Sequence, residues 1–171
     1  HQSARVISSW NDASKVEVVG YPILQSQIDE IKNIKNKPID KNQIKVLITS
    51  TRQAGFCIEH KNAMINAFKD LKKYFDTKQN FSIIWRLSGN ISEKINVKNQ
   101  LKDKNSSELS LLIKESDIVI SAQSTVVIEA MLQKKPVAII DYLNSPQYYP
   151  TAWFINSKNL IESTIKDMIK K

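Results

Sequence analysis

The chain has 171 residues, 42% of them apolar, and carries a formal net charge of +8. This length suffices for one hydrophobic core, and no apolar run approaches the roughly 20 residues of a membrane-spanning helix, so we expect one soluble, cytoplasmic domain with extensions. Only three of the 25 basic residues are arginine, and the lysines are spread over predicted helix faces and linkers without a basic stripe interleaved with aromatic residues. This distribution argues against a nucleic-acid partner and leaves weak peripheral contact with an anionic membrane as an alternative.

Residues 1–44 show no regular alternation of strands and helices. They hold two short strand candidates, at 6–8 and 16–19, a short helix near 28–34 and a polar linker rich in lysine and asparagine. The chain does not open at a methionine and enters a strand candidate within a few residues, so we expect it to be cut from something longer. We interpret this region as an interdomain linker with the remnant of an amino-terminal half, and residues 45–171 as one domain.

Short, β-branched segments that are apolar on both faces recur from residue 45 onward, separated by segments with helical spacing. Such strands are typical of a parallel sheet that is covered on both sides. The strand candidates are 45–49, 81–85, 117–121, 136–141 and, more weakly, 152–155.

Three helices are expected between and after these strands. Asn105 and Glu108 form a capping signature at the start of the second, and the third begins near Lys158 with Leu160 among its inward residues. The first has an apolar stripe with the i, i+3, i+4, i+7 spacing, formed by Met64, Ala67, Phe68, Leu71 and Phe75.

This order of elements predicts an α/β fold, a Rossmann-like doubly wound parallel sheet. Ligands bind such sheets outside the carboxyl ends of the strands. We therefore expect functional side chains directly after Thr49, Trp85, Ser121 and Asp141.

The segment 116–141 contains a strand, a turn rich in hydroxyl and amide groups, and a helix that begins near Ser124. The N–H groups and positive dipole end of that helix form an anion site to which Ser124 and Thr125 add hydroxyl donors, with Ser121 and Gln123 in the same turn. A diphosphate fits such a site. The alternative is that Ser124 only caps the helix, which requires no ligand.

Glu129 lies one turn into the same helix, between apolar neighbours from Val126 to Leu132. We expect this helix to be buried all round, so that its carboxylate needs a partner or a raised pKa. One partner is the pair of ribose hydroxyls of a nucleotide bound at the anion site. A salt bridge with a nearby lysine is the alternative.

This segment contains the pattern S-D-I-V-I-S-x-x-S-T-x-x-x-E-A-x-x-x-x-K-P-V. The pattern resembles the donor-nucleotide segment of GT-B glycosyltransferases and of the related UDP-N-acetylglucosamine 2-epimerases. The resemblance implies that Ser124 and Thr125 receive the pyrophosphate and that Glu129 holds the ribose. Residues 15–24 also look like the segment through which these families enter their carboxyl-terminal domain. The chain is thus expected to be the carboxyl-terminal, nucleotide-binding half of a GT-B architecture.

Two departures from the family patterns narrow the choice. Retaining enzymes with paired glutamates eight positions apart would need a glutamate where this chain has Ser121. The epimerases usually place two glycines in the turn, which here reads Ala122-Gln123-Ser124. Both departures favour a glycosyltransferase outside that retaining subgroup.

Other candidate site residues follow the remaining strands. Thr51 and Arg52 come after the first strand and Arg86 after the second, where an arginine could neutralise a phosphate or close a surface ion pair. His60 and Tyr142 are further candidates, with structural roles as the alternative for both.

The expected ligand is a nucleotide sugar, most simply UDP-linked, which serves as substrate; neither a cofactor nor a metal is expected. The resemblance places the general base in an amino-terminal half of the same protein, so no catalytic residue is assigned in this chain. The parent enzyme would act in cell-surface polysaccharide or glycolipid synthesis. Half of a sugar-nucleotide 2-epimerase and a non-enzymatic α/β binding or signalling module are the alternatives.

Overall fold

The computed structural model describes residues 9, 38–40, 42–51, 57–97, 100–101, 106–147 and 149–170. The chain divides into two compact units, His1–Ile34 and Lys35–Lys171, and all elements below belong to the second. The strand and helix candidates between residues 6 and 34 lie outside the described residues. The domain boundary between residues 44 and 45 stays a prediction.

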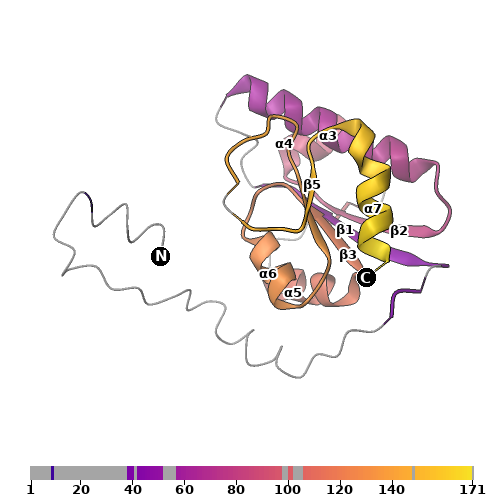
Figure 1. Cartoon of the computed structure of the whole chain (residues 1–171). Coiled ribbons are helices and arrows are strands. Elements are labelled where there is room, and N and C mark those ends of the chain that lie inside the picture. The colour runs from indigo at the N-terminus through magenta and orange to yellow at the C-terminus, as the bar shows by residue number, and fades with distance from the viewer. Residues whose placement is uncertain are drawn as a thin grey trace. The chain divides into compact units, whose positions relative to one another are not determined.

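Five parallel strands form one sheet with the order β2-β1-β3-β4-β5 (Figure 1). All five strand candidates are confirmed, with ends that shift by one residue. The strands are β1 (Ile44–Thr49), β2 (Phe81–Arg86), β3 (Ile118–Ser121), β4 (Val137–Ile140) and β5 (Trp153–Ile155).

Helices cover both faces of this sheet, which explains why its central strands are apolar on both sides. Every residue of β3 and β4 is buried. One face is covered by α3 (Ile58–Asp76), α4 (Gly89–Ile95) and α7 (Ile161–Ile169), and the other by α5 (Ser106–Glu115) and α6 (Val126–Leu132). The predicted doubly wound α/β fold is therefore confirmed.

Each face has its own hydrophobic cluster, and the alternation of side chains along β1 feeds both. Ile48 belongs to the cluster beneath α3, α4 and α7, together with Phe68 and Ile165. Leu47 belongs to the cluster beneath α5 and α6, together with Ile113. Because successive β1 residues point to opposite faces, Thr49 points to the α5 and α6 side, next to Leu47 two positions earlier.

Helix α3 follows its predicted stripe closely. Ala67, Phe68, Leu71 and Phe75 are buried, whereas Met64 is half-buried. The stripe faces the sheet because these positions repeat at helical spacing.

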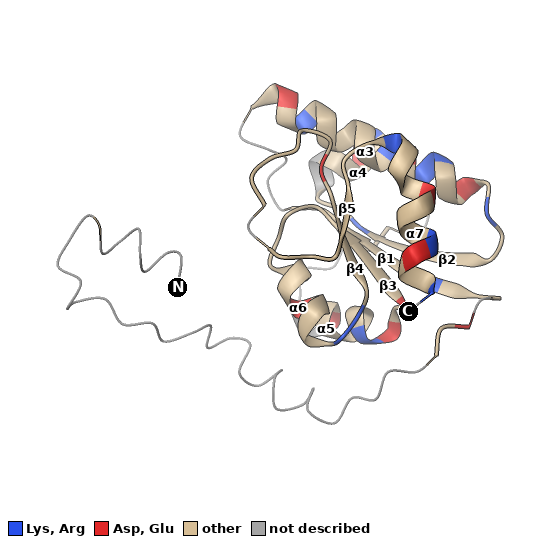
Figure 2. Cartoon of the chain, viewed as in Figure 1, with Lys and Arg blue, Asp and Glu red and all other residues tan. Residues whose placement is uncertain are grey.

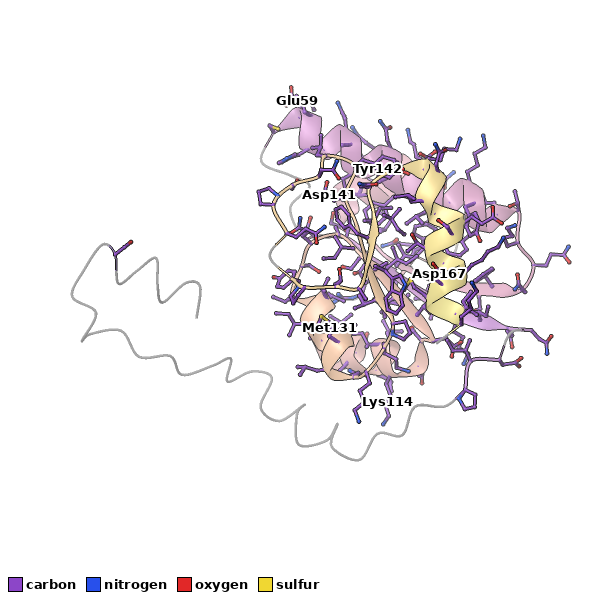
Figure 3. The ribbon with its side chains drawn as sticks, viewed as in Figure 1. Glu59, Lys114, Met131, Asp141, Tyr142 and Asp167 are labelled. Atoms are coloured by element: carbon purple, nitrogen blue, oxygen red, sulfur yellow. The ribbon has the colours of Figure 1, made fainter. Side chains whose placement is uncertain are left out.

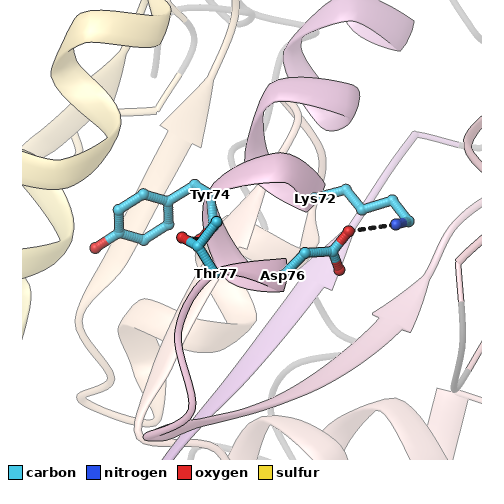
Figure 4. A network of polar contacts seen from close by, with 4 residues as sticks. All are labelled: Lys72, Tyr74, Asp76 and Thr77. Atoms are coloured by element: carbon cyan, nitrogen blue, oxygen red, sulfur yellow. Dashed lines mark hydrogen bonds and ion pairs between the residues drawn. The ribbon is translucent and has the colours of Figure 1, made fainter.

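The carboxyl end of α3 is closed by local polar contacts. The Tyr74 carbonyl accepts both the Thr77 hydroxyl, at 2.8 Å, and the Thr77 backbone N–H, at 3.3 Å, which satisfies one of the last carbonyls of the helix. Lys72 and Asp76, one turn apart, form an ion pair beside it (Figure 4). Such an exposed pair adds little to stability.

The last helix begins with a 3-10 turn, η3 (Lys158–Leu160), before α7. Ile161, Ile165 and Met168 are buried as expected, but Leu160 is 40% exposed. The expectation that Leu160 points inward is wrong, because the 3-10 turn changes the helical phase before the α-helical spacing starts.

Basic and acidic residues are interspersed along α3 and α7 (Figure 2). Each of the three ion pairs seen among described residues joins side chains three or four positions apart, along α3 or at α7 and its carboxyl cap: Lys72 with Asp76, Lys166 with Glu162 and Lys170 with Asp167. None of the described helices combines the length and apolar character that crossing a bilayer requires.

Truncation of the core should be far more costly than truncation of an exposed apolar residue. Phe68→Ala, at a fully buried position, should lower the free energy of unfolding by about 3–5 kcal/mol. Leu111→Ala, on α5 at a residue that is 53% exposed, should change it by less than about 0.5 kcal/mol. Urea unfolding followed by circular dichroism measures both, and similar losses would contradict the burial pattern.

Candidate functional site

The carboxyl ends of β1 and β3 form the switch point of the sheet. The chain leaves β1 for α3 on one face and leaves β3 for α6 on the other, although the two strands are neighbours. In doubly wound sheets with this strand order, ligands bind at the point where neighbouring strands send the chain in opposite directions. We therefore take this edge as the candidate site.

Three hydroxyl groups are linked at the switch point. Thr49 and Ser121 lie opposite each other in the register of β1 and β3. The Thr49 Oγ1 donates to the Ser121 Oγ at 2.8 Å, and the Ser121 Oγ lies 3.1 Å from the Ser124 Oγ. We call Thr49, Ser121 and Ser124 the hydroxyl chain. It runs from the buried sheet to the turn before α6.

The hydroxyl chain becomes accessible only at its last member. Thr49 and Ser121 are fully buried, whereas Ser124 is half-buried. The Ser121 hydroxyl is enclosed and would reach a ligand through Ser124, so the assignment of Ser121 to the nucleotide site stays a prediction.

The turn after β3 is tied to the loop after β4 through Asp141. The Asp141 carboxylate accepts the backbone N–H groups of Leu143 at 2.9 Å and Ser145 at 3.0 Å. The Gln123 Nε2 lies 3.4 Å from the Asp141 Oδ2, at the long limit of a hydrogen bond. Gln123 thus contributes a contact between loops, while Thr125, the residue before α6, is exposed.

Helix α6 is less buried than its sequence predicts. Glu129 is half-buried, and Met131 is 39% exposed (labelled in Figure 3). The expectation of a helix buried all round is wrong, because α6 packs one face on β3, β4 and α5 and presents its other face outward. Only Val126, Val127 and Ala130 of this helix are buried.

Arg86 stands at the same edge of the sheet as the hydroxyl chain. Its register partner is Thr49, so its side chain leaves the sheet on the same face. The residue is half-buried, and no ion pair joins it to another described residue. The structure thus brings one arginine beside the hydroxyl chain.

The other candidates after β1 are placed less favourably. The Thr51 hydroxyl lies 3.9 Å from the Met64 Sδ of α3, so Thr51 turns toward that helix. His60 is a half-buried residue of the first turn of α3, one turn before Met64. Arg52 lies outside the described residues.

Tyr142 packs on the side of the sheet opposite to α6. Its ring lies against the cluster beneath α3, α4 and α7, and its hydroxyl donates to the Asp70 Oδ2 of α3 at 3.2 Å (Figure 3). Burial raises the pKa of the Tyr142 phenol, and the charge and hydrogen bond of Asp70 raise that pKa further. Tyr142 is therefore a clamp between α3 and the loop after β4 and is not part of the hydroxyl chain.

Two residues of this edge were not selected as site candidates from the sequence: Thr49 and Asp141. The signal for Thr49 was present, since both KVLIT and DIVIS end in a hydroxyl residue after an apolar run. Their pairing depends on which strands are neighbours, which the sequence does not specify. Among the described residues, no group of three or more His, Cys, Asp and Glu side chains is placed to hold a metal ion.

Neither a protein-family model nor a curated protein sequence matches the chain. Several solved structures share its fold. A co-structure of MnaA from S. aureus with UDP has 18% sequence identity and a TM-score of 0.66, over 99% of this chain and 49% of that one. A putative UDP-N-acetylglucosamine 2-epimerase from Listeria monocytogenes has 12% identity and a TM-score of 0.58, over 91% and 40%. The wall teichoic acid polymerase TagF has 17% identity and a TM-score of 0.50, over 98% and 48%.

These identities are low, so the likeness shows the fold. The fold expected from the resemblance, a Rossmann-like domain as in GT-B enzymes and their epimerase relatives, is thereby confirmed. The chain spans about half the length of each of these structures.

The clamp between Tyr142 and Asp70 should make stability depend on alkaline pH. A tyrosine whose pKa is raised on folding stabilises the fold below its unfolded pKa of about 10, and this contribution is lost as the pH rises through the folded pKa. The free energy of unfolding of the wild-type chain should therefore fall more steeply above about pH 10 than that of Tyr142→Phe. Asp70→Asn should show an intermediate slope, because the charge is lost while an acceptor remains. Identical slopes in urea unfolding for all three proteins would contradict the assignment.

Proposed function

We propose that the chain binds the diphosphate of a nucleotide sugar, most simply a UDP-sugar, as the donor-binding half of a glycosyltransferase. The observation that carries this proposal is the hydroxyl chain at the switch point of the sheet, with Arg86 beside it on the same face. We place the parent enzyme in the cytoplasm or at the membrane periphery, in the synthesis of a cell-surface polysaccharide or glycolipid.

The chemistry of the edge suits a diphosphate. Hydroxyl donors and an arginine are groups that bind phosphate oxygens, and the guanidinium does so with two parallel hydrogen bonds. The fold likeness to a protein solved with UDP supports the same ligand class. The resemblance of the 116–141 segment points to the same edge independently.

Each residue has one role in this proposal. Ser124 and the exposed Thr125 donate to the phosphates, Arg86 offsets their charge, and Glu129 accepts from the ribose hydroxyls. The half-burial of Glu129 leaves it reachable by a ligand. Glu129 already has an interaction within the chain, so a nucleotide would compete with that interaction or extend it.

The reaction would be displacement at the anomeric carbon of the sugar, with this half stabilising the leaving diphosphate. An amino-terminal half of the same protein would supply the acceptor site and the general base. No residue of this chain is therefore given a catalytic role.

A second candidate function is that of half of a sugar-nucleotide 2-epimerase, favoured by the fold likeness to the Listeria protein. The two functions differ in their products. With a nucleotide sugar and an acceptor, a transferase joined to its other half releases the nucleoside diphosphate, whereas an epimerase returns an isomerised nucleotide sugar and needs no acceptor.

Removal of the two proposed phosphate donors should weaken binding of a diphosphate selectively. Ser124→Ala/Thr125→Ala should raise the Kd for UDP by about tenfold or more, since hydrogen bonds to a charged group are lost. The Kd for uridine should hardly change, because uridine has no phosphate. Isothermal titration calorimetry measures both ligands.

The matched control is Ser163→Ala, which removes an exposed hydroxyl on α7, on the opposite face of the sheet. It should leave both affinities unchanged. Equal losses for UDP and uridine in the double variant would remove Ser124 and Thr125 from the phosphate site.

Glu129→Gln tests the proposed contact with the ribose, which is present in both UDP and uridine. This change keeps the side-chain shape but removes the charge, so it should weaken UDP and uridine alike, by about 1.5–3 kcal/mol. The free energy of unfolding should change by less than about 1 kcal/mol, because a half-exposed carboxylate is screened by solvent. A large loss of stability with unchanged affinities would instead identify Glu129 as a structural ion-pair partner.

A further inference from the structure

The two buried members of the hydroxyl chain, Thr49 and Ser121, lie at the ends of apolar strands whose packing does not require a hydroxyl group. Thr49 follows Val46, Leu47 and Ile48, and Ser121 ends a strand whose other members are all apolar. A buried hydroxyl without a partner is costly, but a hydroxyl pair can often be exchanged for an apolar pair of similar shape at little net cost. The pair is therefore better explained by what it does to Ser124, the accessible member.

Counting protons shows that the hydroxyl chain has two arrangements. The Ser121 hydroxyl has one proton and accepts the Thr49 proton. It lies 2.7 Å from the Ala122 carbonyl oxygen and 3.1 Å from the Ser124 Oγ. When it donates to Ala122, the contact with Ser124 is a hydrogen bond only if Ser124 donates inward to Ser121. When it donates to Ser124 instead, the Ser124 proton is free to point outward.

The outward arrangement aligns all three hydroxyls toward the surface. Thr49 donates to Ser121, Ser121 donates to Ser124, and Ser124 donates to a ligand. Aligned hydroxyls polarise one another, so the last proton is a stronger donor than that of an isolated serine. In both arrangements the Thr49 hydroxyl donates a hydrogen bond to the Ser121 oxygen. Because this oxygen already has a donor, the Ser124 hydroxyl can point its proton outward.

We propose that Thr49 is a positioning residue for the diphosphate site. Its buried hydroxyl donates a hydrogen bond to Ser121, and this leaves the Ser124 hydroxyl free to donate a hydrogen bond to the phosphate. The inference rests on the proposed function and deepens it. It assigns a role to a residue that cannot touch the ligand, because Thr49 is fully buried.

Loss of the Thr49 hydroxyl should hold the Ser124 proton inward. In Thr49→Val, which keeps the side-chain shape, Ser124 is the one side-chain hydroxyl of the described residues left to donate to Ser121. A phosphate that takes the Ser124 proton then leaves a buried oxygen without a donor. Removing that oxygen as well, in Thr49→Val/Ser121→Ala, abolishes the competition.

The test is titration of the 171-residue chain and its variants with UDP and with uridine, beside thermal unfolding. Thr49→Val should raise the Kd for UDP by about fivefold to tenfold with no change for uridine, the loss of about one hydrogen bond. Thr49→Ser should restore wild-type affinity, and Thr49→Val/Ser121→Ala should bind UDP more tightly than Thr49→Val alone.

The double variant separates positioning from mere structural support. If Thr49 only stabilises the strand ends, the double variant binds UDP no better than the single one, and the inference is overturned. Wild-type UDP affinity in a folded Thr49→Val overturns it too, while leaving the proposed function standing. Should Thr49→Val not fold, Thr49→Ala takes its place in the same comparison, and equal UDP affinities of Thr49→Ala and Thr49→Ala/Ser121→Ala overturn the inference. A wild-type chain that binds neither ligand overturns the proposed function and this inference with it.

Discussion

The pairing of β1 with β3 is the constraint on which the rest of this edge depends. The two strands are far apart in sequence, yet their parallel register places Thr49 opposite Ser121. Because the chain turns to opposite faces after these strands, the described helices that follow them, α3 and α6, lie on opposite sides of the sheet. The polar residues at the carboxyl ends of β1 and β3 therefore lie between two helices that leave on opposite faces of the sheet. Ligands of doubly wound sheets bind at this place.

Packing on the two faces keeps that edge in register. The α3 side contributes the larger aromatic residues of the core, and the α5 and α6 side contributes smaller aliphatic ones. Tyr142 joins the loop after β4 to α3, while Asp141, its neighbour in sequence, shapes the same loop from within. The turn with Ser124 is thereby held between a rigid strand and a loop anchored on the opposite face.

The sequence predicts the five strands and the helices α3, α5, α6 and α7 because these elements have a local signal, whereas α4 was not expected. The strand ends were located to one residue and the α3 stripe to individual side chains, since both depend on the spacing of apolar residues. Leu160 was misplaced because a 3-10 turn breaks that spacing. The apolar neighbours of Glu129 predict that it is buried, but apolar neighbours along a chain do not specify how many sides of a helix are covered.

The candidate site was predicted less completely, because its contacts join segments distant in sequence. Ser124 and Arg86 could be selected as residues that follow strands, whereas the bond between Thr49 and Ser121 requires knowing that β1 adjoins β3. Tyr142 was selected by the same rule of position, yet the loop after β4 turns it to the other face. A residue that follows a strand is known to lie at the carboxyl ends of the strands, but its position in the sequence does not specify which face of the sheet its side chain joins.

The charges along this edge follow the order of the strands. Arg86 ends β2, neutral hydroxyls end β1 and β3, and Asp141 follows β4. The Asp141 carboxylate would repel an anion, but both its oxygens accept backbone N–H groups of its own loop, which offsets part of its charge. An anionic ligand at this edge is therefore favoured on the side of β2 and β1, beside Arg86, and Ser124 is the accessible donor where that favourable side meets the start of α6.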